Sequence, residues 1–245
     1  MSSYILVHGA WHGAWCWERL IPLLEREGHR VDAPDLPGHG SDQTPLSAVT
    51  LDSCMKRVGQ ALLAAPEPSF LVGHSMAGAV ISQAAERFPE RIRCLVYVTA
   101  FLLSDGQSRR HLPDVGTSIV QQNLIFSEDH ESVEVDANVR RQAFYGECST
   151  ADAGPAAGRL GPTPSCLFTT AVTLSDERYG QVPRVYIECL KDQAIPPRLQ
   201  RAMQAAVPCG RTFSINTDHS PFLSAPEELA RLLLAVNATS DEMLG

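Results

Sequence analysis

The chain has 245 residues and a mass of 26.7 kDa, which suits one α/β domain with a modest insertion. Its formal net charge of −8 argues against nucleic acid or anionic membranes as main partners, because both need concentrated Lys and Arg. The seven cysteines are scattered, and neither a signal peptide nor an apolar stretch of about 20 residues is visible. We therefore expect a cytoplasmic protein with reduced thiols, without a disulfide scaffold, a zinc site or a membrane span.

Short apolar segments and helical patterns alternate along the chain. Several of the apolar segments are hydrophobic at consecutive positions, which is typical of parallel strands buried on both faces. The predicted strands are residues 4–7, 30–33, 70–72, 94–98, 185–189 and 212–215. The predicted helices are residues 17–24, 51–62, 75–88, 197–206 and 229–236. This alternation predicts an α/β fold with a doubly wound, mostly parallel sheet of about six strands.

The middle of the chain breaks this rhythm. It contains a charged run at residues 127–134 and a passage rich in Gly, Ala and Pro at 151–164, with weak helical patterning. The segment is too long for a linker and too poor in apolar residues for a separate domain. We expect residues 103–181 to form a small helical cap over one end of the sheet, and residues 1–102 and 182–245 to form the core.

The strongest chemical signal is the sequence GHSMAG at residues 73–78, directly after an apolar strand and before a helix. A strand, a sharp turn carrying Gly-x-Ser-x-small and a helix together make the nucleophile elbow of serine hydrolases. Small residues are needed beside the serine because the turn is tight, and Gly73 and Ala77 meet this need. The alternative is a buried serine that caps an ordinary helix. The context favours Ser75 as a nucleophile.

A serine hydroxyl needs a general base, and in this fold the base follows the acid in the chain. His219 lies in a loop between the last predicted strand and the C-terminal helix, at the carboxyl end of the sheet. His111 and His130 fall within the predicted cap and are weaker candidates. We expect His219 to be the base.

The acid of such a triad should also lie at the carboxyl end of a strand. Asp192 follows the strand at 185–189 and meets this requirement. Asp105 and Asp218 are rivals, but Asp218 is adjacent to His219 and is better explained as a carboxylate that structures its loop. Asp192 is the predicted acid.

The first strand ends in His-Gly-Ala-Trp-His-Gly, which is typical of the loop that supplies one backbone N–H to an oxyanion hole. The predicted donors are the amides of Ala10 and Met76. For His8, His12 and His39 we favour structural roles without chemistry.

A pocket is expected between the cap and the sheet, with apolar walls and few polar groups. Arg109 and Arg110 are interpreted as solvated surface charge. The predicted substrate-binding residues are Trp11, Phe101, Leu102 and Phe144, with Met76, Phe126, Tyr145 and Phe168 as further positions where core packing is the alternative.

These motifs resemble those of the α/β-hydrolase superfamily, and more closely those of plant methyl esterases, salicylate-binding esterases, hydroxynitrile lyases and their bacterial relatives. The resemblance rests on residues 7–15 (VHGAWHGAW), 35–40 (DLPGHG), 73–78 (GHSMAG), 192–196 (DQAIP) and 218–219 (DH). It covers the sheet domain from end to end and implies triad and oxyanion roles for the residues already named.

The resemblance also separates hydrolases from lyases. The lyases of this group have a threonine where Gly9 stands and a lysine where Ser220 stands, so hydrolysis is favoured here. The tryptophan that shapes the plant pockets from the cap has no counterpart, and salicylate-type substrates are not implied. The sequence therefore predicts a cofactor-free and metal-free esterase acting on a small-molecule ester, with a homodimer left open. Lactone or amide hydrolysis, lyase chemistry and non-enzymatic ligand binding on the same fold are the alternatives.

Overall fold

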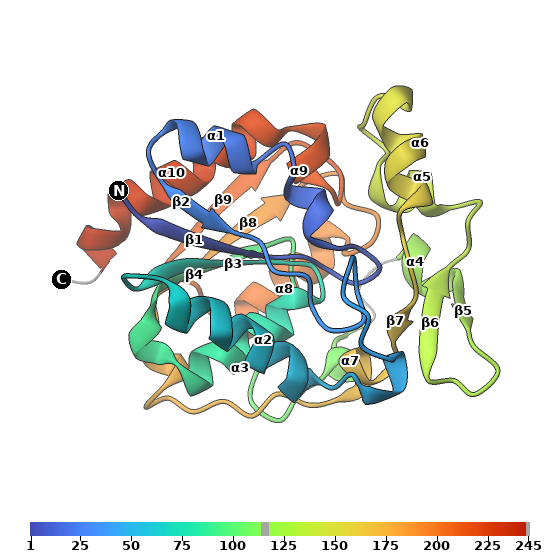
Figure 1. Ribbon diagram of the computed structural model, residues 1–245, viewed down its shortest axis with the longest axis horizontal. Coiled ribbons are helices and arrows are strands. Elements are labelled where there is room, and N and C mark those ends of the chain that lie inside the picture. Colours follow the sequence, from blue (N-terminus) through green and yellow to red (C-terminus); the bar gives the residue numbers. More distant parts are fainter. Residues whose placement is uncertain (114–117, 244–245) are drawn as a thin grey trace.

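The structure is a computed structural model that describes residues 1–113 and 118–243. Residues 114–117 of the predicted cap and 244–245 of the predicted core lie outside the described residues. All six predicted strands occur in one parallel sheet of order β2-β1-β3-β4-β8-β9 (Figure 1). These strands are β1 (Ser3–Val7), β2 (Arg30–Asp32), β3 (Ser69–His74), β4 (Ile92–Val98), β8 (Arg184–Cys189) and β9 (Arg211–Ile215). The predicted α/β-hydrolase architecture of the sheet is confirmed.

The sheet reverses its direction of growth between β1 and β3. The chain passes from β1 outward to β2, and then returns to pair β3 with the opposite edge of β1. In open α/β sheets, ligands bind beyond the carboxyl ends of the strands at such a switch point. The loops that follow β1 and β3 therefore face the place where a binding site is expected.

Both faces of the sheet are covered, which explains the consecutive apolar residues of its strands. Ile5 and Val7 of β1 pack into one hydrophobic core, and Tyr4 and Leu6 pack into the other. This alternation follows from the two-residue period of a strand. Helices α2 (Leu51–Ala64), α3 (Ala77–Arg87) and α8 (Pro197–Ala206) cover the first face, and α1 (Ile21–Arg26) and α10 (Pro226–Met243) cover the second (Figure 1).

The helix predicted at 197–206 occurs with these bounds as α8, and the other predicted helices occur with shifted ends. The helix expected at 17–24 is divided into a 3-10 turn, η1 (Ala14–Trp17), and α1, because Pro22 fits only in the first turn of a helix. The final helix α10 begins earlier and ends later than the predicted 229–236. No helix within the described residues is long and apolar enough to cross a membrane. Short elements complete the core: η2 (Leu46–Ala48), η3 (Pro89–Arg91), η5 (Tyr179–Gln181) and α9 (Pro221–Ser224).

The segment between β4 and β8 contains helices, as the prediction of a small helical cap expects, and also a second sheet that this prediction did not include. Three short strands form an antiparallel sheet of order β5-β6-β7. In β6 the buried Val133 and Val135 alternate with the half-buried Ser132 and Glu134, which is the period of a strand with one buried face. The segment comprises η4 (Arg109–His111), α4 (Ile119–Gln122), β5 (Leu124–Phe126), β6 (Ser132–Val135), α5 (Arg140–Phe144), α6 (Thr150–Gly158), β7 (Thr163–Pro164) and α7 (Cys166–Thr169).

Trp11 connects this second sheet to the loop that follows β1. Its indole Nε1–H donates to the carbonyl of Val133 at 2.9 Å, and its amide donates to Thr163 Oγ1 at 2.7 Å. Its carbonyl accepts from the amide of Gly161 at 3.0 Å. Figure 1 shows the second sheet beyond the carboxyl ends of the central strands. The predicted boundaries of the cap at residues 103 and 181 stay a prediction.

Candidate active site

Ser75 lies in the turn between β3 and α3 with φ +56°. This conformation is unusual for a residue with a Cβ and costs about 1–3 kcal/mol. The turn is fixed against the end of β4, because the Ser75 amide donates to Val98 at 3.3 Å and its carbonyl accepts from Phe101 at 2.9 Å. A Cβ at Gly78 would lie 2.1 Å from the Phe101 carbonyl oxygen, so the first turn of α3 requires glycine there.

The carboxylate of Asp192 accepts a hydrogen bond from His219 Nδ1 at 2.7 Å, and both side chains are buried. Thr99 Oγ1 donates to the same oxygen, Oδ2. The other oxygen, Oδ1, accepts the amides of Ala194 and Ile195 at 2.7 and 2.8 Å. Four donors therefore fix the carboxylate, and the imidazole is left with Nε2 as its free ring nitrogen.

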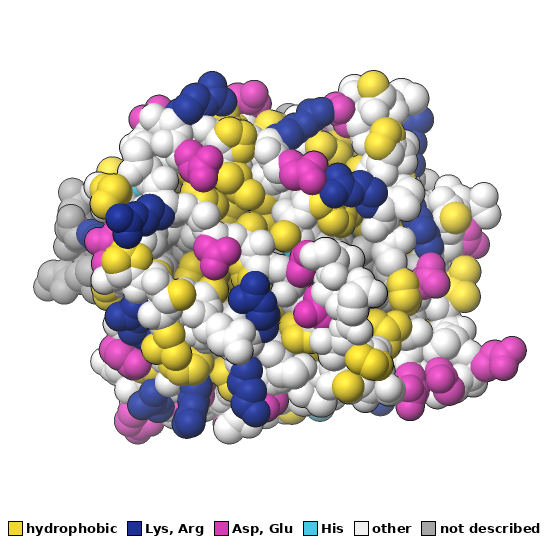
Figure 2. Space-filling model, viewed as in Figure 1, with side chains coloured by type: hydrophobic (Ala, Val, Ile, Leu, Met, Phe, Trp, Pro, Cys, Tyr) yellow, Lys and Arg dark blue, Asp and Glu magenta, His cyan; other side chains and the backbone are white. Residues whose placement is uncertain are grey.

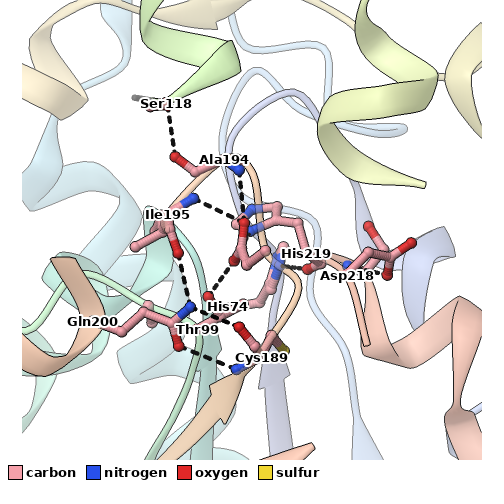
Figure 3. Close-up of polar contacts among 12 residues, drawn as sticks. His74, Thr99, Ser118, Cys189, Ala194, Ile195, Gln200, Asp218 and His219 are labelled. Atoms are coloured by element: carbon pink, nitrogen blue, oxygen red, sulfur yellow. Dashed lines mark hydrogen bonds and ion pairs between the residues drawn. The ribbon is translucent and has the colours of Figure 1, made fainter. Parts of the chain in front are cut away.

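The loop that carries Asp192 is held by the buried side chain of Gln200. Its Oε1 accepts the amide of Cys189, and its Nε2 donates to the carbonyls of Cys189 at 3.0 Å and Ile195 at 2.7 Å (Figure 3). A single amide from α8 thus joins the two ends of the loop. Gln200 and Thr99 support the site, and no motif in the sequence indicated either residue.

His74 holds the backbone of His219. Burial lowers the pKa of His74 well below its usual value, so the ring is neutral. Its Nε2–H donates to the His219 carbonyl at 2.8 Å. The two rings lie 4.6 Å apart, and the Phe144 ring packs against His219 at 5.7 Å. The residue before the nucleophile therefore positions the predicted base through its main chain.

Ser75 and His219 line one cavity of about 610 Å³. Trp11 and Phe101, two of the predicted substrate-binding residues, also line it, and their contact with a substrate stays a prediction. The cavity walls are otherwise mostly apolar and combine the sheet-end loops with the second sheet and its flanking helices. They include Val120, Leu124, Phe126, Val133, Phe168, Ala194, Ile195 and Leu199.

Two predicted pocket residues do not belong to this wall. Leu102 is fully buried, and its amide contacts Met203 Sδ at 3.4 Å within the core. Phe144 is also fully buried, and it packs between the rings of Trp11 at 5.5 Å and His219. Leu102 and Phe144 both pack into the hydrophobic core and do not line the cavity.

The two predicted oxyanion donors lie beside the nucleophile. Met76 directly follows Ser75 at the N-terminus of α3, and Ala10 lies in the loop after β1. Within the described residues, neither amide donates a hydrogen bond to another group, whereas the Trp11 amide is taken by Thr163. A Cβ on Gly9 would meet both Ser75 Cβ and His74 Nδ1 at 2.8 Å. The loop therefore approaches the nucleophile closely, and the assignment of the two amides stays a prediction.

The histidines after β1 have structural hydrogen bonds. His8 Nε2 accepts the Leu36 amide at 3.1 Å, and His12 Nδ1 donates to the carbonyl of Ala10 at 2.8 Å. Tyr145 contributes its hydroxyl to His12 Nε2 at 2.8 Å. Burial lowers the pKa of His8 and of His12 to about 3, so both rings are neutral. His39 is likewise bonded, to Pro37 and to Thr163. These contacts agree with the structural interpretation.

Within the described residues, none of the rival acids and bases hydrogen-bonds to the side chain of Asp192 or of His219. Asp105 accepts the amide of Leu174 at 2.8 Å, and Asp218 accepts the amide of Glu147 at 2.8 Å. His111 accepts the amide of Ser108 in η4, and His130 lies on the cavity wall without contacting the carboxylate of Asp192. Asp218 therefore ties the loop of residue 219 to the segment between α5 and α6.

Arg109 and Arg110, interpreted from the sequence as solvated surface charge, both line the cavity. Arg110 is exposed, as that interpretation expects, whereas Arg109 is half-buried. The guanidinium of Arg109 lies 6.0 Å from the centre of the Phe101 ring and donates to Gln121 Oε1 at 2.6 Å. No motif in the sequence indicated that these two arginines line the site.

The chain belongs to the alpha/beta hydrolase family, whose model matches residues 4–232. Methylesterase 1 of Arabidopsis thaliana is 34% identical over 96% of this chain and 95% of its own length. Three other relatives from that plant are longer, and the chain spans 64%, 56% and 56% of their length. The crystal structure of a pyrethroid hydrolase has a TM-score of 0.90 with this chain, at 30% identity and 99% coverage of both chains.

The positions that distinguish lyases can now be placed. The side chain of a threonine at Gly9 would begin with a Cβ that lies 2.8 Å from atoms of Ser75 and His74. Ser220 is fully buried at the start of α9. The structure around Gly9 therefore fits glycine and leaves no space for threonine without a shift of the loop.

Proposed function

We propose that this protein is a carboxylic ester hydrolase that forms an acyl-enzyme on Ser75. The observation that carries the proposal is the buried hydrogen bond of His219 to Asp192 at a cavity whose wall also contains Ser75. The names of relatives support the substrate class, since they include a methylesterase and a pyrethroid hydrolase.

The mechanism follows from the hydrogen-bond pattern. His219 Nδ1–H is engaged by the carboxylate, so Nε2 carries the lone pair that takes the proton from Ser75 as the hydroxyl attacks the ester carbonyl. Asp192 stabilises the resulting imidazolium, and the amides of Ala10 and Met76 hold the oxyanion. The imidazolium gives its proton to the leaving alcohol. Water then attacks the acyl-enzyme with His219 again as base, which releases the acid and restores Ser75.

The test uses hydrolysis of short-chain aryl esters together with labelling by a serine-directed phosphonate. We expect turnover by the wild type, loss of at least a thousandfold in kcat for Ser75→Ala, and phosphonate on the peptide that contains Ser75. Ser82→Ala is a matched control, because Ser82 is a buried serine of α3 whose hydroxyl bonds Gly78 and Tyr97. Ligand binding without turnover by the wild type would favour a non-enzymatic binding protein.

The context of the enzyme is also proposed. We infer a cytoplasmic location from the reduced-thiol interpretation of the scattered cysteines, and a small-molecule ester as the partner, with a homodimer as the assembly to be tested. Imaging of a tagged protein checks the location, and light scattering of the purified chain checks the assembly. The chemistry proposed above uses side chains and amides of the chain itself, and the described residues contain no group of three or more metal-binding side chains that could hold an ion.

A further inference from the structure

Among the described residues, the ionisable side chains on the cavity wall are all of basic types. Arg109, Arg110 and His130 line it, and the described residues of its lining include neither Asp nor Glu. This contrasts with the chain as a whole, which has 28 acidic and 20 basic residues. On the face shown in Figure 2, acidic and basic side chains are interspersed. A cavity with charges of one sign attracts ligands of the opposite sign.

Arg109 is held in place at the wall. It belongs to η4, which begins with a capping box formed by Ser108 and His111. Its guanidinium lies over Phe101 and donates to Gln121, and both of these residues line the cavity. These two contacts restrict the rotamers of Arg109 before a ligand binds. Less side-chain entropy is therefore lost on binding.

An apolar surface connects the nucleophile to these cations. The amide of Phe101 donates to the carbonyl of Ser75, and the ring of Phe101 extends toward the guanidinium of Arg109. Val120 and Leu124, which line the same cavity, are also apolar. A ligand that spans this surface would place a hydrocarbon chain on the apolar wall and its far end at the cations.

We propose that the cavity selects esters that carry a carboxylate at the end remote from the scissile bond, such as half-esters of dicarboxylic acids. The scissile end rests on the proposed function of Ser75, and the remote end rests on Arg109 and Arg110. A planar guanidinium matches the two oxygens of a carboxylate and stays charged at every relevant pH, which is why it selects this group over a neutral amide of the same shape.

The test compares two esters that differ only in charge, the monophenyl ester of adipic acid and the phenyl ester of adipic acid monoamide. We expect kcat/KM of the wild type to be about fivefold to tenfold higher for the ester with the carboxylate at low ionic strength. The preference should be smaller at high salt, because salt screens the charges of Arg109 and Arg110. The double variant Arg109→Gln, Arg110→Gln should bring this ratio near one. Arg110→Glu should reverse it. Arg141→Gln, which removes an exposed arginine of α5 outside the cavity lining, should keep the wild-type ratio.

Calorimetry of the same two esters with Ser75→Ala separates this proposal from the proposed function. If the wild type hydrolyses neither ester but Ser75→Ala binds the carboxylate more tightly, the anion preference stands and the hydrolase assignment fails. If both esters are hydrolysed and bound equally well, the anion preference is wrong and the hydrolase assignment stands. An unchanged ratio in the double variant would also overturn the role of the two arginines.

Discussion

Thr99 donates its hydroxyl to Oδ2 of Asp192, the oxygen that also accepts His219 Nδ1. Thr99 is fully buried at the end of β4 and has φ +38°, a left-handed conformation that is rare for a β-branched residue. Its amide donates to Ile187 at 2.9 Å. This strained backbone conformation directs the Thr99 hydroxyl toward Asp192, where it completes the set of four donors to the carboxylate.

Replacement of Thr99 by valine should therefore reduce catalysis more than substrate binding. The substitution keeps the shape of the side chain and removes a hydrogen bond to a buried charged group, so we expect kcat for an aryl ester to fall about tenfold with KM nearly constant. Thr99→Ser keeps the hydroxyl and should recover most of the activity. A serine variant as slow as the valine variant would assign the effect to packing instead.

At Gly9, the addition of a single carbon atom should strongly reduce activity. A methyl group at Gly9 would displace the loop that carries the Ala10 amide, because its Cβ lies 2.8 Å from Ser75 Cβ. Loss of one oxyanion donor reduces kcat about a hundredfold or more, and we expect this for Gly9→Ala. Gly154→Ala in α6 is the matched control, since a Cβ there meets nothing within 4 Å. If Gly9→Ala retains wild-type kcat, the assigned oxyanion hole is wrong.

Asp218 should contribute to stability more than to chemistry. Its carboxylate accepts the amides of Glu147 at 2.8 Å and Ser220 at 3.1 Å, and the hydroxyl of Ser224 at 2.8 Å. Asp218→Asn weakens these charge-assisted bonds and turns an amide group toward N–H donors, which should lower the free energy of unfolding by about 2 kcal/mol. Urea denaturation measures this value. Activity per folded molecule should fall less than in Thr99→Val.

The neutral histidines predict acid sensitivity. The pKa of His8 and of His12 is about 3 in the folded protein, and the ordinary value is 6.5. Between these values the unfolded chain binds more protons, so stability is complete above about pH 6.5 and is lost as the pH falls toward 3. Each histidine contributes a slope of up to about 1.4 kcal/mol per pH unit.

Urea denaturation between pH 7 and 4 tests this linkage with His12→Gln. The variant should be less stable at pH 7, because the buried contacts of His12 with Ala10 and Tyr145 are changed. Its stability should, however, depend on pH less steeply, by close to one proton. Parallel curves for the wild type and the variant would show that His12 is protonated in the folded state as readily as in the unfolded chain.

The sequence predicted the sheet and the Ser75, His219 and Asp192 candidates because their signals are local. Consecutive apolar residues mark buried parallel strands, and GHSMAG needs only its own strand and helix to be identified. Thr99 and Thr163 had no such signal. Thr99 contacts Asp192 from another strand, and Thr163 contacts Trp11 across 152 positions of the chain. Ordinary residue types gain these roles only through tertiary packing.

The second sheet was missed for a different reason. Val133 and Val135 alternate with polar residues, and this period was available in the sequence. The neighbouring charges at 127–134 obscured it, and β7 has only the two residues Thr163–Pro164, too short for any periodicity. Arg109 contacts Phe101 and, in α4, Gln121, and this placement could not be predicted before the segment was folded.

Trp11, Ser75 and Thr99 are non-glycine residues with left-handed backbones, and each follows one of the neighbouring strands β1, β3 and β4. Glycine adopts this conformation without strain. Ser75→Gly should therefore melt at a higher temperature than the wild type while losing its nucleophile. Selection for thermal stability alone would favour such unstrained and inactive variants. Stability and catalytic activity therefore oppose each other at the carboxyl ends of these strands.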